Sequence, residues 1–271
     1  MGKKERLDVR LVQEGFSASR EKARAVIMAG LVYVDHERMD KPGMKVDLDR
    51  PITVKGQVHP YVSRGGLKLE KAIKTFSLDF TDKVVMDIGA STGGFTDCSL
   101  QNGARLVYAI DVGYGQLDWS LRQNEKVVVM ERTNFRYLTP QEWEGEAIDF
   151  ATIDVSFISL RIILPVLKDF LKIGGGVVAL IKPQFEAGRE QVGKHGVVRD
   201  PAVHLQVIEN IAAFSATLGY TIKGLSFSPI TGGEGNIEFL LYLEWENKPE
   251  GYPESISELM KKTVQEAHNV F

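Results

Sequence analysis

The segment Lys83–Phe95, with the sequence KVVMDIGASTGGF, decides the fold of this 271-residue chain. Residues 84–86 form an apolar run, which is typical of a strand that is buried on both faces. We expect the strand to end at Asp87 and a helix to begin near Gly94, with glycines between them. A strand, a glycine turn and a helix in this order bring backbone N–H groups close to a ligand. The segment therefore predicts a ligand-binding turn, although some glycine turns serve the backbone alone.

The glycine spacing separates this turn from the dinucleotide-binding fingerprint G-x-G-x-x-G and so argues against an NAD-dependent oxidoreductase. The pattern here is D-x-G-x-x-x-G-G. It resembles the first motif of S-adenosylmethionine (SAM) methyltransferases, in which the glycines admit the methionine end of the cofactor. The resemblance implies SAM as the cofactor, with contacts from Asp87, Gly89, Ala90, Ser91, Gly93, Gly94 and Phe95. Asp87 would either bind the amino end of SAM or hold the glycine loop.

Strands and helices alternate after this turn. We predict strands at 83–87, 105–111, 126–130, 148–154, 176–182, 220–227 and 236–244, and helices at 67–76, 94–101, 116–122, 159–171 and 201–218. This alternation implies a mostly parallel sheet with helices on both faces. No helix separates the last two strands, so one of them must run antiparallel. The predicted fold class is α/β, a doubly wound, mostly parallel sheet of the SAM-methyltransferase type.

A smaller module is predicted in residues 1–58. Two short helices at 5–15 and 19–30 precede strands near Val32–Val34 and Pro51–Val54. This arrangement resembles the RNA-binding module of a small-subunit ribosomal protein, pseudouridine synthases and tyrosyl-tRNA synthetases. The matching residues are Arg6, Leu7, Asp8, Leu11, Gly15, Ser19, Arg20, Ala23, Ile27, Gly30, Val32 and Val34. The resemblance implies a small N-terminal α+β RNA-binding domain, a linker at 59–66 and a methyltransferase domain at 67–271.

Charge is distributed unevenly along the chain. The net charge is −3, yet residues 1–80 hold 16 Lys and Arg against 11 Asp and Glu. This excess favours contact with a polyanion, unless the asymmetry is due to chance. Each basic residue alone could be a solvated surface charge, and only the cluster favours RNA. The candidate RNA-binding residues are Arg6, Arg20, Lys22, Arg24 and Arg64.

Composition predicts a soluble cytoplasmic protein. Hydrophobic residues make up 44% of the chain and charged residues 25%. Cys98 is the only cysteine, which leaves no internal disulfide to form. The longest apolar stretch, Val177–Ile181, is too short to cross a bilayer, and the N-terminus does not read as a secretory signal. The five histidines show no metal-ligand spacing, so we expect no metal and no membrane partner.

Ligands of doubly wound sheets bind at the carboxyl ends of the strands. Asp111 ends the second predicted strand, where an acid commonly accepts hydrogen bonds from ribose; it could also be a turn aspartate. The adenine contact is expected in 131–134, and Asn134 is included as a candidate although the sequence does not select among the four residues. Asp154 and Lys182 end the fourth and fifth strands, and Lys182 could simply reach solvent.

Four residues resemble the Lys-Asp-Lys-Glu set of FtsJ-type ribose 2′-O-methyltransferases: Lys68, Asp154, Lys182 and Glu238. A ribose hydroxyl must lose its proton as it attacks the sulfonium methyl. A lysine can orient or accept that proton only if its own pKa falls, through burial or a nearby cation. Lys68 would supply the cation, and the two acids would position the lysines. The N-P-P-aromatic loop of many amine methyltransferases is replaced here by Asp-Val-Ser-Phe, which disfavours methylation of a base.

The whole chain is similar to the TlyA family. The segments KHGVVRDP (194–201) and SPITGGEGN (228–236) complete this resemblance. The family methylates cytidine ribose hydroxyls in ribosomal RNA, and many members are labelled haemolysins. The resemblance implies SAM-dependent 2′-O-methylation of ribosomal RNA, with ribosomal RNA or ribosomal subunits as partners. A SAM-binding, ribosome-docking factor with little turnover is the alternative. A membrane-active haemolysin would need an insertion segment or an export signal, and we find neither. The oligomeric state stays open.

Overall fold

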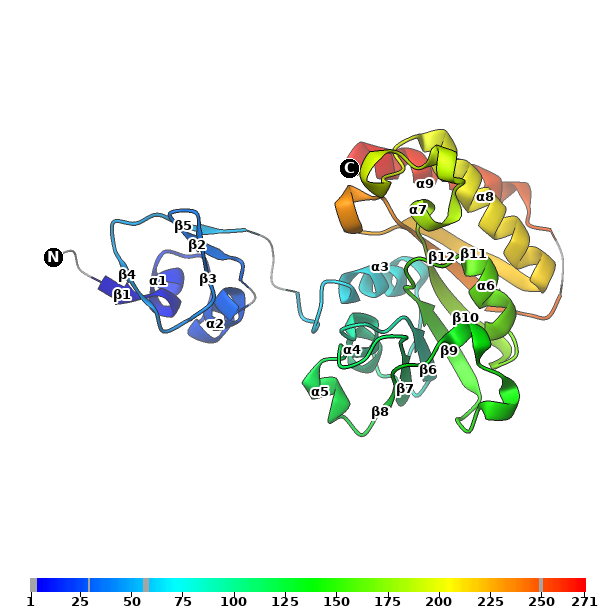
Figure 1. Cartoon of the computed structure of the whole chain (residues 1–271), viewed down its shortest axis with the longest axis horizontal. Helices are drawn as coiled ribbons and strands as arrows, with labels where there is room; N and C mark the ends of the chain where they lie inside the picture. The colour runs from blue at the N-terminus through cyan, green and yellow to red at the C-terminus, as the bar shows by residue number, and fades with distance from the viewer. Residues whose placement is uncertain (1–3, 29, 56–58, 249–250) are drawn as a thin grey trace. The chain divides into compact units, whose positions relative to one another are not determined.

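The computed structural model describes residues 4–28, 30–55, 59–248 and 251–271 (Figure 1). The chain divides into two compact units, Met1–Pro60 and Tyr61–Phe271. The boundary at residue 58 that we predicted between the RNA-binding domain and the linker falls outside the described residues. Each unit has its own hydrophobic core and is described by itself.

The first unit is a small α+β fold. Its elements are β1 (Lys4–Arg6), α1 (Leu7–Gln13), α2 (Arg20–Met28), β2 (Val32–Val34), β3 (Glu37–Met39), β4 (Lys45–Asp47) and β5 (Ile52–Val54). β1 pairs with β4, and β2 lies between β3 and β5, all antiparallel. Apolar residues at helical spacing, such as Leu7, Leu11, Ala23 and Ile27, are fully buried between the helices and strands.

Several predicted boundaries in this unit were wrong. Residues 4–6 form a strand, so the first helix is shorter than the predicted 5–15. The second helix is described only to Met28, and position 29 lies outside the described residues. Strands β3 and β4 were not predicted, because three-residue strands carry too little alternation to be distinguished from turns.

The second unit confirms the predicted doubly wound sheet. Its strands are β6 (Val84–Ile88), β7 (Leu106–Ile110), β8 (Val127–Met130), β9 (Ile148–Ile153), β10 (Leu171–Ile181), β11 (Tyr220–Phe227) and β12 (Phe239–Trp245). The order is β11-β12-β10-β9-β6-β7-β8. β12 is antiparallel to both of its neighbours, and the other pairings are parallel. The expected reversed strand is therefore β12, inserted between β10 and β11.

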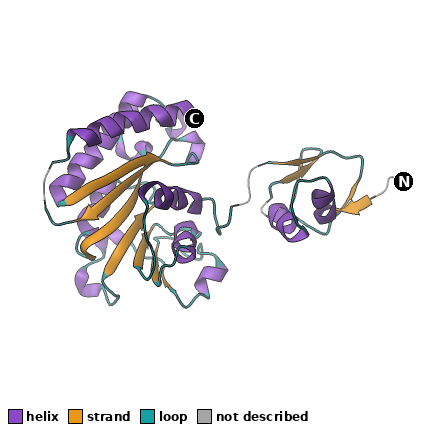
Figure 2. Ribbon diagram, turned by 180° about the vertical axis from the view of Figure 1, so that it is seen from behind, coloured by secondary structure: helices purple, strands orange, loops and turns teal. Residues whose placement is uncertain are grey.

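Helices cover both faces of this sheet (Figures 1 and 2). α6 (Leu160–Leu167), α8 (Pro201–Leu218) and α9 (Glu254–Val270) pack on one face, and α3 (Gly66–Phe76) and α4 (Gly94–Gln101) on the other. The shorter helices are α5 (Trp119–Arg122), α7 (Pro183–Glu186), η1 (Phe135–Tyr137), η2 (Pro140–Glu142), η3 (Arg189–Gln191), η4 (Lys194–Gly196) and η5 (Gly233–Gly235). The sheet is thus held between two buried apolar layers, one on each face, and these layers keep the carboxyl ends of the parallel strands in place.

Two predicted helices in this unit had wrong bounds, and one helix was not predicted. The helix expected at 159–171 ends at Leu167, and β10 already begins at Leu171. The first part of β10 contains three consecutive glycines, which allow the strand to begin before the predicted residue 176. Gly174 has φ +80°, and the pairing of β10 with β9 shifts register between Leu171 and Gly176. The helix expected at 116–122 is reduced to α5, and α9 was not predicted.

Candidate active site

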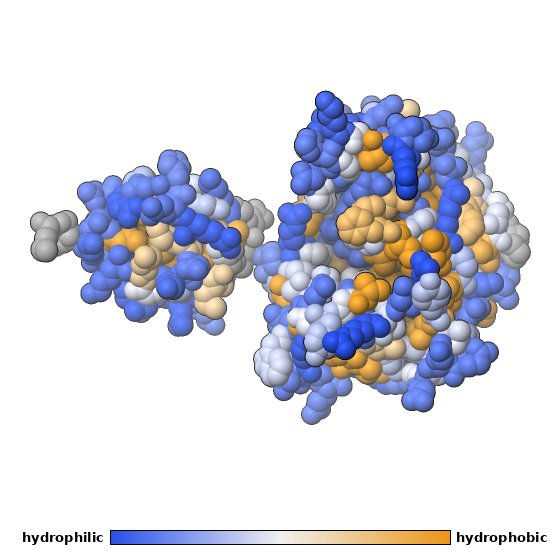
Figure 3. Space-filling model, viewed as in Figure 1, coloured by the Kyte–Doolittle hydropathy of each residue, from blue (hydrophilic) through white to orange (hydrophobic). Residues whose placement is uncertain are grey.

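Two cavities adjoin at the carboxyl ends of the parallel strands. Their volumes are about 580 Å³ and 530 Å³. We call the first the catalytic cavity and the second the cofactor cavity. Both are lined by Gly89, Ser91, Asp154, Ser156 and Phe157. Apolar side chains gather in the middle of the face of the second unit that Figure 3 shows. The cavity linings include apolar residues such as Ile163 as well as charged ones such as Lys182, so a ligand that spans both cavities would meet both kinds of group.

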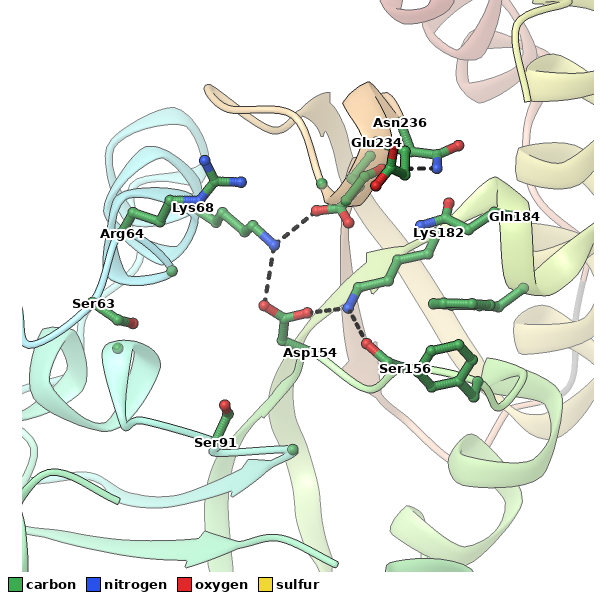
Figure 4. A pocket seen from close by; sticks show the side chains of 18 of the residues that line it. Ser63, Arg64, Lys68, Ser91, Asp154, Ser156, Lys182, Gln184, Glu234 and Asn236 are labelled. Carbon is green, nitrogen blue, oxygen red and sulfur yellow. Dashed lines mark hydrogen bonds and ion pairs between the residues drawn. The ribbon is translucent and has the colours of Figure 1, made fainter. Parts of the chain in front are cut away.

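The four predicted catalytic residues meet in the catalytic cavity (Figure 4). Lys68 Nζ lies 2.7 Å from Glu238 Oε2 and 3.2 Å from Asp154 Oδ2. The other oxygen of Asp154, Oδ1, lies 2.6 Å from Lys182 Nζ. Asp154 therefore joins the two lysines, and the four side chains form one continuous chain of ion pairs.

Each member of this network comes from a different element. Lys68 projects from α3, Asp154 follows β9, Lys182 follows β10, and Glu238 precedes β12. Three of the four side chains are nearly inaccessible, with exposures of 9% for Lys68, 9% for Lys182 and 3% for Glu238. Buried charges of this kind persist only when they are paired. Because each side chain is attached to a different element, the packing of α3 against the sheet is what keeps the pairs together.

The pKa shifts follow from this pairing. Burial opposes the charged form of Lys68, but the carboxylates of Asp154 and Glu238 outweigh burial and raise the pKa of Lys68. Burial likewise opposes the charged form of Asp154, and the two lysines outweigh it, so the pKa of Asp154 is lowered. Lys68 is therefore a fixed cation and Asp154 a fixed anion at neutral pH, which assigns Lys68 an electrostatic role.

In the glycine turn, atoms of neighbouring segments lie so close to the backbone that no space is left for a side chain. Gly89 has φ +86°, and a Cβ there would lie 2.6 Å from the carbonyl oxygen of Asp154. At Gly94 a Cβ would overlap Ser63 Oγ and lie 2.7 Å from the nitrogen of Gly66. Glycine is therefore required at both positions, because the turn touches Asp154 on one side and the start of α3 on the other.

Asp87 and Gly93 do not line either cavity. Asp87 is fully buried and accepts hydrogen bonds from Thr96 Oγ1 at 2.6 Å and Thr152 Oγ1 at 3.0 Å. Burial raises the pKa of Asp87 to about 6. Of the two roles that the sequence left open, the contacts favour the one in which Asp87 holds the glycine loop, since it ties α4 to β9.

Asp111 is a turn aspartate whose carboxylate also lines the cofactor cavity. Its Oδ1 accepts from the nitrogen of Gly113 at 2.7 Å, as a turn aspartate does, and its Oδ2 accepts from the nitrogen of Ser91 at 2.8 Å. The carboxylate also lines the cofactor cavity together with Asn134. A carboxylate has about four acceptor positions, so Asp111 could still accept from ribose hydroxyls.

The cofactor cavity fits SAM in the chemistry of its walls. Asp111 and Asn134 supply polar groups, and Ile88, Ile110 and Ile163 supply an apolar surface suited to a flat adenine ring. The catalytic cavity continues from it past Gly89, with Ala90, Gly94 and Phe95 in its lining. One elongated ligand could thus place its nucleoside in one cavity and its reactive sulfonium in the other.

Several residues of the catalytic cavity were not identified from the sequence. Ser156 accepts a hydrogen bond from Lys182 Nζ at 3.1 Å. Phe157 is 90% exposed, has φ +63°, and its ring lies 4.9 Å from that of Phe185. Gln184 also lines the cavity. The segment Asp-Val-Ser-Phe contains Ser156 and Phe157, and its place directly after the fourth predicted strand is the sequence feature that marks both residues.

The predicted RNA-binding residues fall into different settings. Arg6 Nε donates to Asp8 Oδ1 at 2.9 Å, and Arg20 donates to Asp8 Oδ2 at 3.0 Å. Asp8 is fully buried, and its two arginines lower its pKa to about 2, chiefly through the hydrogen bond from Arg6. Lys22 and Arg24 are exposed on α2. Arg6 and Arg20 therefore also stabilise the first unit, whereas Lys22 and Arg24 are free of that role.

Arg64 belongs to the second unit. It lines the catalytic cavity and donates to the carbonyl oxygen of Thr231 at 2.8 Å.

Within the described residues, no helix has the length and apolar character required to span a bilayer.

Comparison with known proteins agrees with this architecture. Residues 61–245 match the model of the FtsJ-like methyltransferases, and residues 5–51 match the S4 domain. YqxC of Bacillus subtilis, provisionally named an rRNA methyltransferase, is 61% identical over 98% of this chain and 95% of its own. The 16S/23S rRNA (cytidine-2′-O)-methyltransferase TlyA of Mycobacterium tuberculosis is 42% identical over 90% of this chain and 91% of its own.

A solved structure from Streptococcus thermophilus, provisionally titled a hemolysin, superimposes with a TM-score of 0.78 at 52% identity. The match covers 98% of this chain and 96% of that one. Sequence, fold and site geometry lead to the same assignment: the chain belongs to the TlyA family of FtsJ-like methyltransferases that carry an N-terminal S4 domain.

Proposed function

We propose that the protein transfers the methyl group of SAM to the 2′-hydroxyl of a cytidine ribose in ribosomal RNA. The observation that carries this proposal is the buried network of Lys68, Asp154, Lys182 and Glu238 beside the boundary of the two cavities. The name of the M. tuberculosis relative supports the cytidine and the ribosomal RNA. A ribosomal RNA substrate also agrees with the cytoplasmic location expected from composition.

The proposed cofactor position follows from the linings of the cavities. The adenosine of SAM would lie in the cofactor cavity against Asp111 and Asn134, and its methionine end would pass Gly89 toward Ser91. When bound, SAM supplies a methyl group on a positively charged sulfur. Asp154 lines both cavities, so its carboxylate would lie next to the place where the cofactor and the ribose meet.

Lys182 is the residue proposed to hold the attacking oxygen. An ammonium group has three N–H donors, and two of those of Lys182 face Asp154 Oδ1 and Ser156 Oγ. The remaining donor can reach the 2′-oxygen, align it with the methyl group and stabilise the negative charge that develops on it. As the new O–CH3 bond forms, the S–CH3 bond would break, S-adenosylhomocysteine would leave, and the hydroxyl proton would pass to solvent water. Lys68 keeps its charge because its pKa is raised, and it offsets the repulsion between the two acids.

The target base is proposed to lie against the aromatic pair at the cavity mouth. The Phe157 and Phe185 rings lie 4.9 Å apart and are inclined at 49°. An exposed phenyl ring offers an unpaired base a stacking surface, and the unusual φ of Phe157 holds that ring out of the protein core. A nucleotide whose base stacks here would present its ribose to Lys182.

Ribosomal subunits that lack the modification provide the direct test. Tritiated SAM is supplied to small and large subunits in separate reactions, and the product is digested to nucleosides for mass spectrometry. We expect 2′-O-methylcytidine in at least one subunit, and no transfer when the mapped nucleotide is 2′-deoxycytidine. Methylation of a base, or tight binding of SAM and subunits without transfer, would contradict the proposal. The second outcome would make the protein a docking factor.

A further inference from the structure

We propose that unpaired nucleotides of the RNA substrate stack on a second surface of the methyltransferase unit, beside the cofactor cavity. This inference rests on the proposed function, since it adds a docking surface for the same RNA. The surface, which we call the aromatic–arginine patch, consists of Tyr114, Trp119, Arg132, Arg136 and Tyr137.

The aromatic side chains of the patch are unusually exposed. The exposed fraction is 69% for Tyr114, 72% for Trp119 and 63% for Tyr137. Large rings are normally buried or involved in an interface, because exposing them to water costs free energy. Tyr114 lies in the segment after β7, Trp119 begins α5 and Tyr137 ends η1. Three such exposed rings indicate a surface that is covered when a partner binds.

Two arginines lie over these rings. The Arg132 guanidinium is 4.1 Å from the centroid of the Tyr114 ring, and that of Arg136 is 4.3 Å from the centroid of the Tyr137 ring. In the part of the chain that the structure describes, neither arginine forms an ion pair with an acid. The neighbouring Glu131 is already paired with Arg122, so the positive charge of the patch is available to an anionic partner.

Backbone contacts hold the patch together. The nitrogen of Arg132 donates to the carbonyl oxygen of Gly113 at 2.9 Å, and the nitrogen of Gln116 donates to Glu131 Oε1 at 3.1 Å. These bonds join the segment after β7 to the segment after β8, two adjacent strands of the sheet. The patch therefore lies on the edge of the sheet at which the catalytic residues also lie, and one strand of RNA could reach both.

The cofactor does not account for the patch. The cofactor cavity is lined by Val112, Gln116, Asn134 and Arg136, but the three exposed rings and Arg132 are outside its lining. Flat rings combined with unpaired arginines match single-stranded RNA, in which bases stack on aromatic faces and phosphates pair with guanidinium groups. A duplex keeps its bases stacked internally, so unpaired nucleotides are the partner that fits this chemistry.

The test compares RNA affinity with SAM affinity in the full-length protein. Affinities are measured for intact ribosomal subunits, protein-free ribosomal RNA transcripts, a short labelled single-stranded RNA of mixed sequence, and its duplex. We expect Tyr114→Leu/Trp119→Leu to weaken single-strand binding at least about tenfold, the loss of one stacked base. Arg132→Gln should reduce the slope of log affinity against log salt by about 0.7. Ile173→Ala is the matched control, because Ile173 is 68% exposed at the amino end of β10.

SAM affinity by calorimetry should stay within about threefold of wild type in these variants. Unchanged RNA affinity in the double variant overturns the patch, and so does an equal loss for duplex and single strand. A loss of SAM affinity would assign the rings to the cofactor instead, and a loss confined to intact subunits would indicate a ribosomal protein. Failure of wild type to methylate RNA would contradict the proposed function alone, because the binding comparison does not require turnover.

Discussion

Replacing Gly89 by alanine should damage the fold and the chemistry together. At φ +86° a side chain costs about 1–2 kcal/mol of stability. The new Cβ would also lie 2.6 Å from the carbonyl oxygen of Asp154, whereas ordinary contacts begin at 3.4 Å. The end of β9 must therefore move by roughly 0.8 Å, and overpacking of this kind costs a further 1–3 kcal/mol or so. We expect Gly89→Ala to lower the free energy of unfolding by about 2–5 kcal/mol.

The same displacement should misplace the Asp154 carboxylate. A misplacement near 1 Å can cost about a hundredfold in rate, so we expect that loss in single-turnover methyl transfer. SAM affinity should fall at least about tenfold, or 1.4 kcal/mol. Gly174→Ala is the matched control: φ is +80° there, and the nearest atom is 3.9 Å from the added Cβ. Denaturant unfolding, calorimetry and methyl transfer are measured for both variants. Equal stability and equal rates in the two would refute this reasoning.

Three further predictions test other parts of the molecule. Lys182→Met should slow single-turnover methyl transfer at least about a hundredfold, while the affinities for SAM and RNA stay within roughly threefold of wild type. Lys172→Met is the control: it removes an exposed ammonium group that is paired with a carboxylate, and it should leave the transfer rate unchanged. Lys22→Glu/Arg24→Glu should weaken subunit binding and flatten its salt dependence without changing SAM affinity, and an unchanged slope would exclude these residues as contacts. Burial lowers the pKa of His204 to about 4, so the unfolded chain alone binds a proton between pH 6.5 and 4, and stability is lost as pH falls through that window. Relative to His204→Gln, wild type should lose up to about 3 kcal/mol between pH 7 and 4 in denaturant titrations; parallel pH profiles would contradict this.

The centre of the sheet was predictable because strands such as β6 and β9 are buried on both faces. Continuous apolar runs such as Val177–Ile181 have few alternatives to a central strand, and their spacing left room for the helices between them. The start of β10 was not predictable in the same way. Leu171 follows the apolar face of α6 at a helical interval, so periodicity alone extended the helix. Only pairing with β9, a contact distant in sequence, ends it.

The site was predictable to the extent that topology brings strand ends together. Asp154 and Lys182 follow adjacent parallel strands, so their proximity is a consequence of the sheet. Glu238 and Lys68 were identified through the family resemblance, because nothing local marks a residue before an antiparallel strand or on a connecting helix. The exposed Phe157 ring was not identified from the sequence, because its contact with Phe185, 28 positions later, and its unusual backbone angle leave no local pattern.

The two lysines and two acids of the catalytic network carry no net charge between them. The reaction centre therefore adds little to long-range attraction of RNA, and that attraction depends on the basic surface residues instead. Added salt screens exposed charges strongly and buried pairs weakly. We therefore expect ionic strength to act differently on the two parts of the proposed activity. It should change how often the RNA substrate is captured, whereas the methyl-transfer step of a captured substrate should proceed at nearly the same rate.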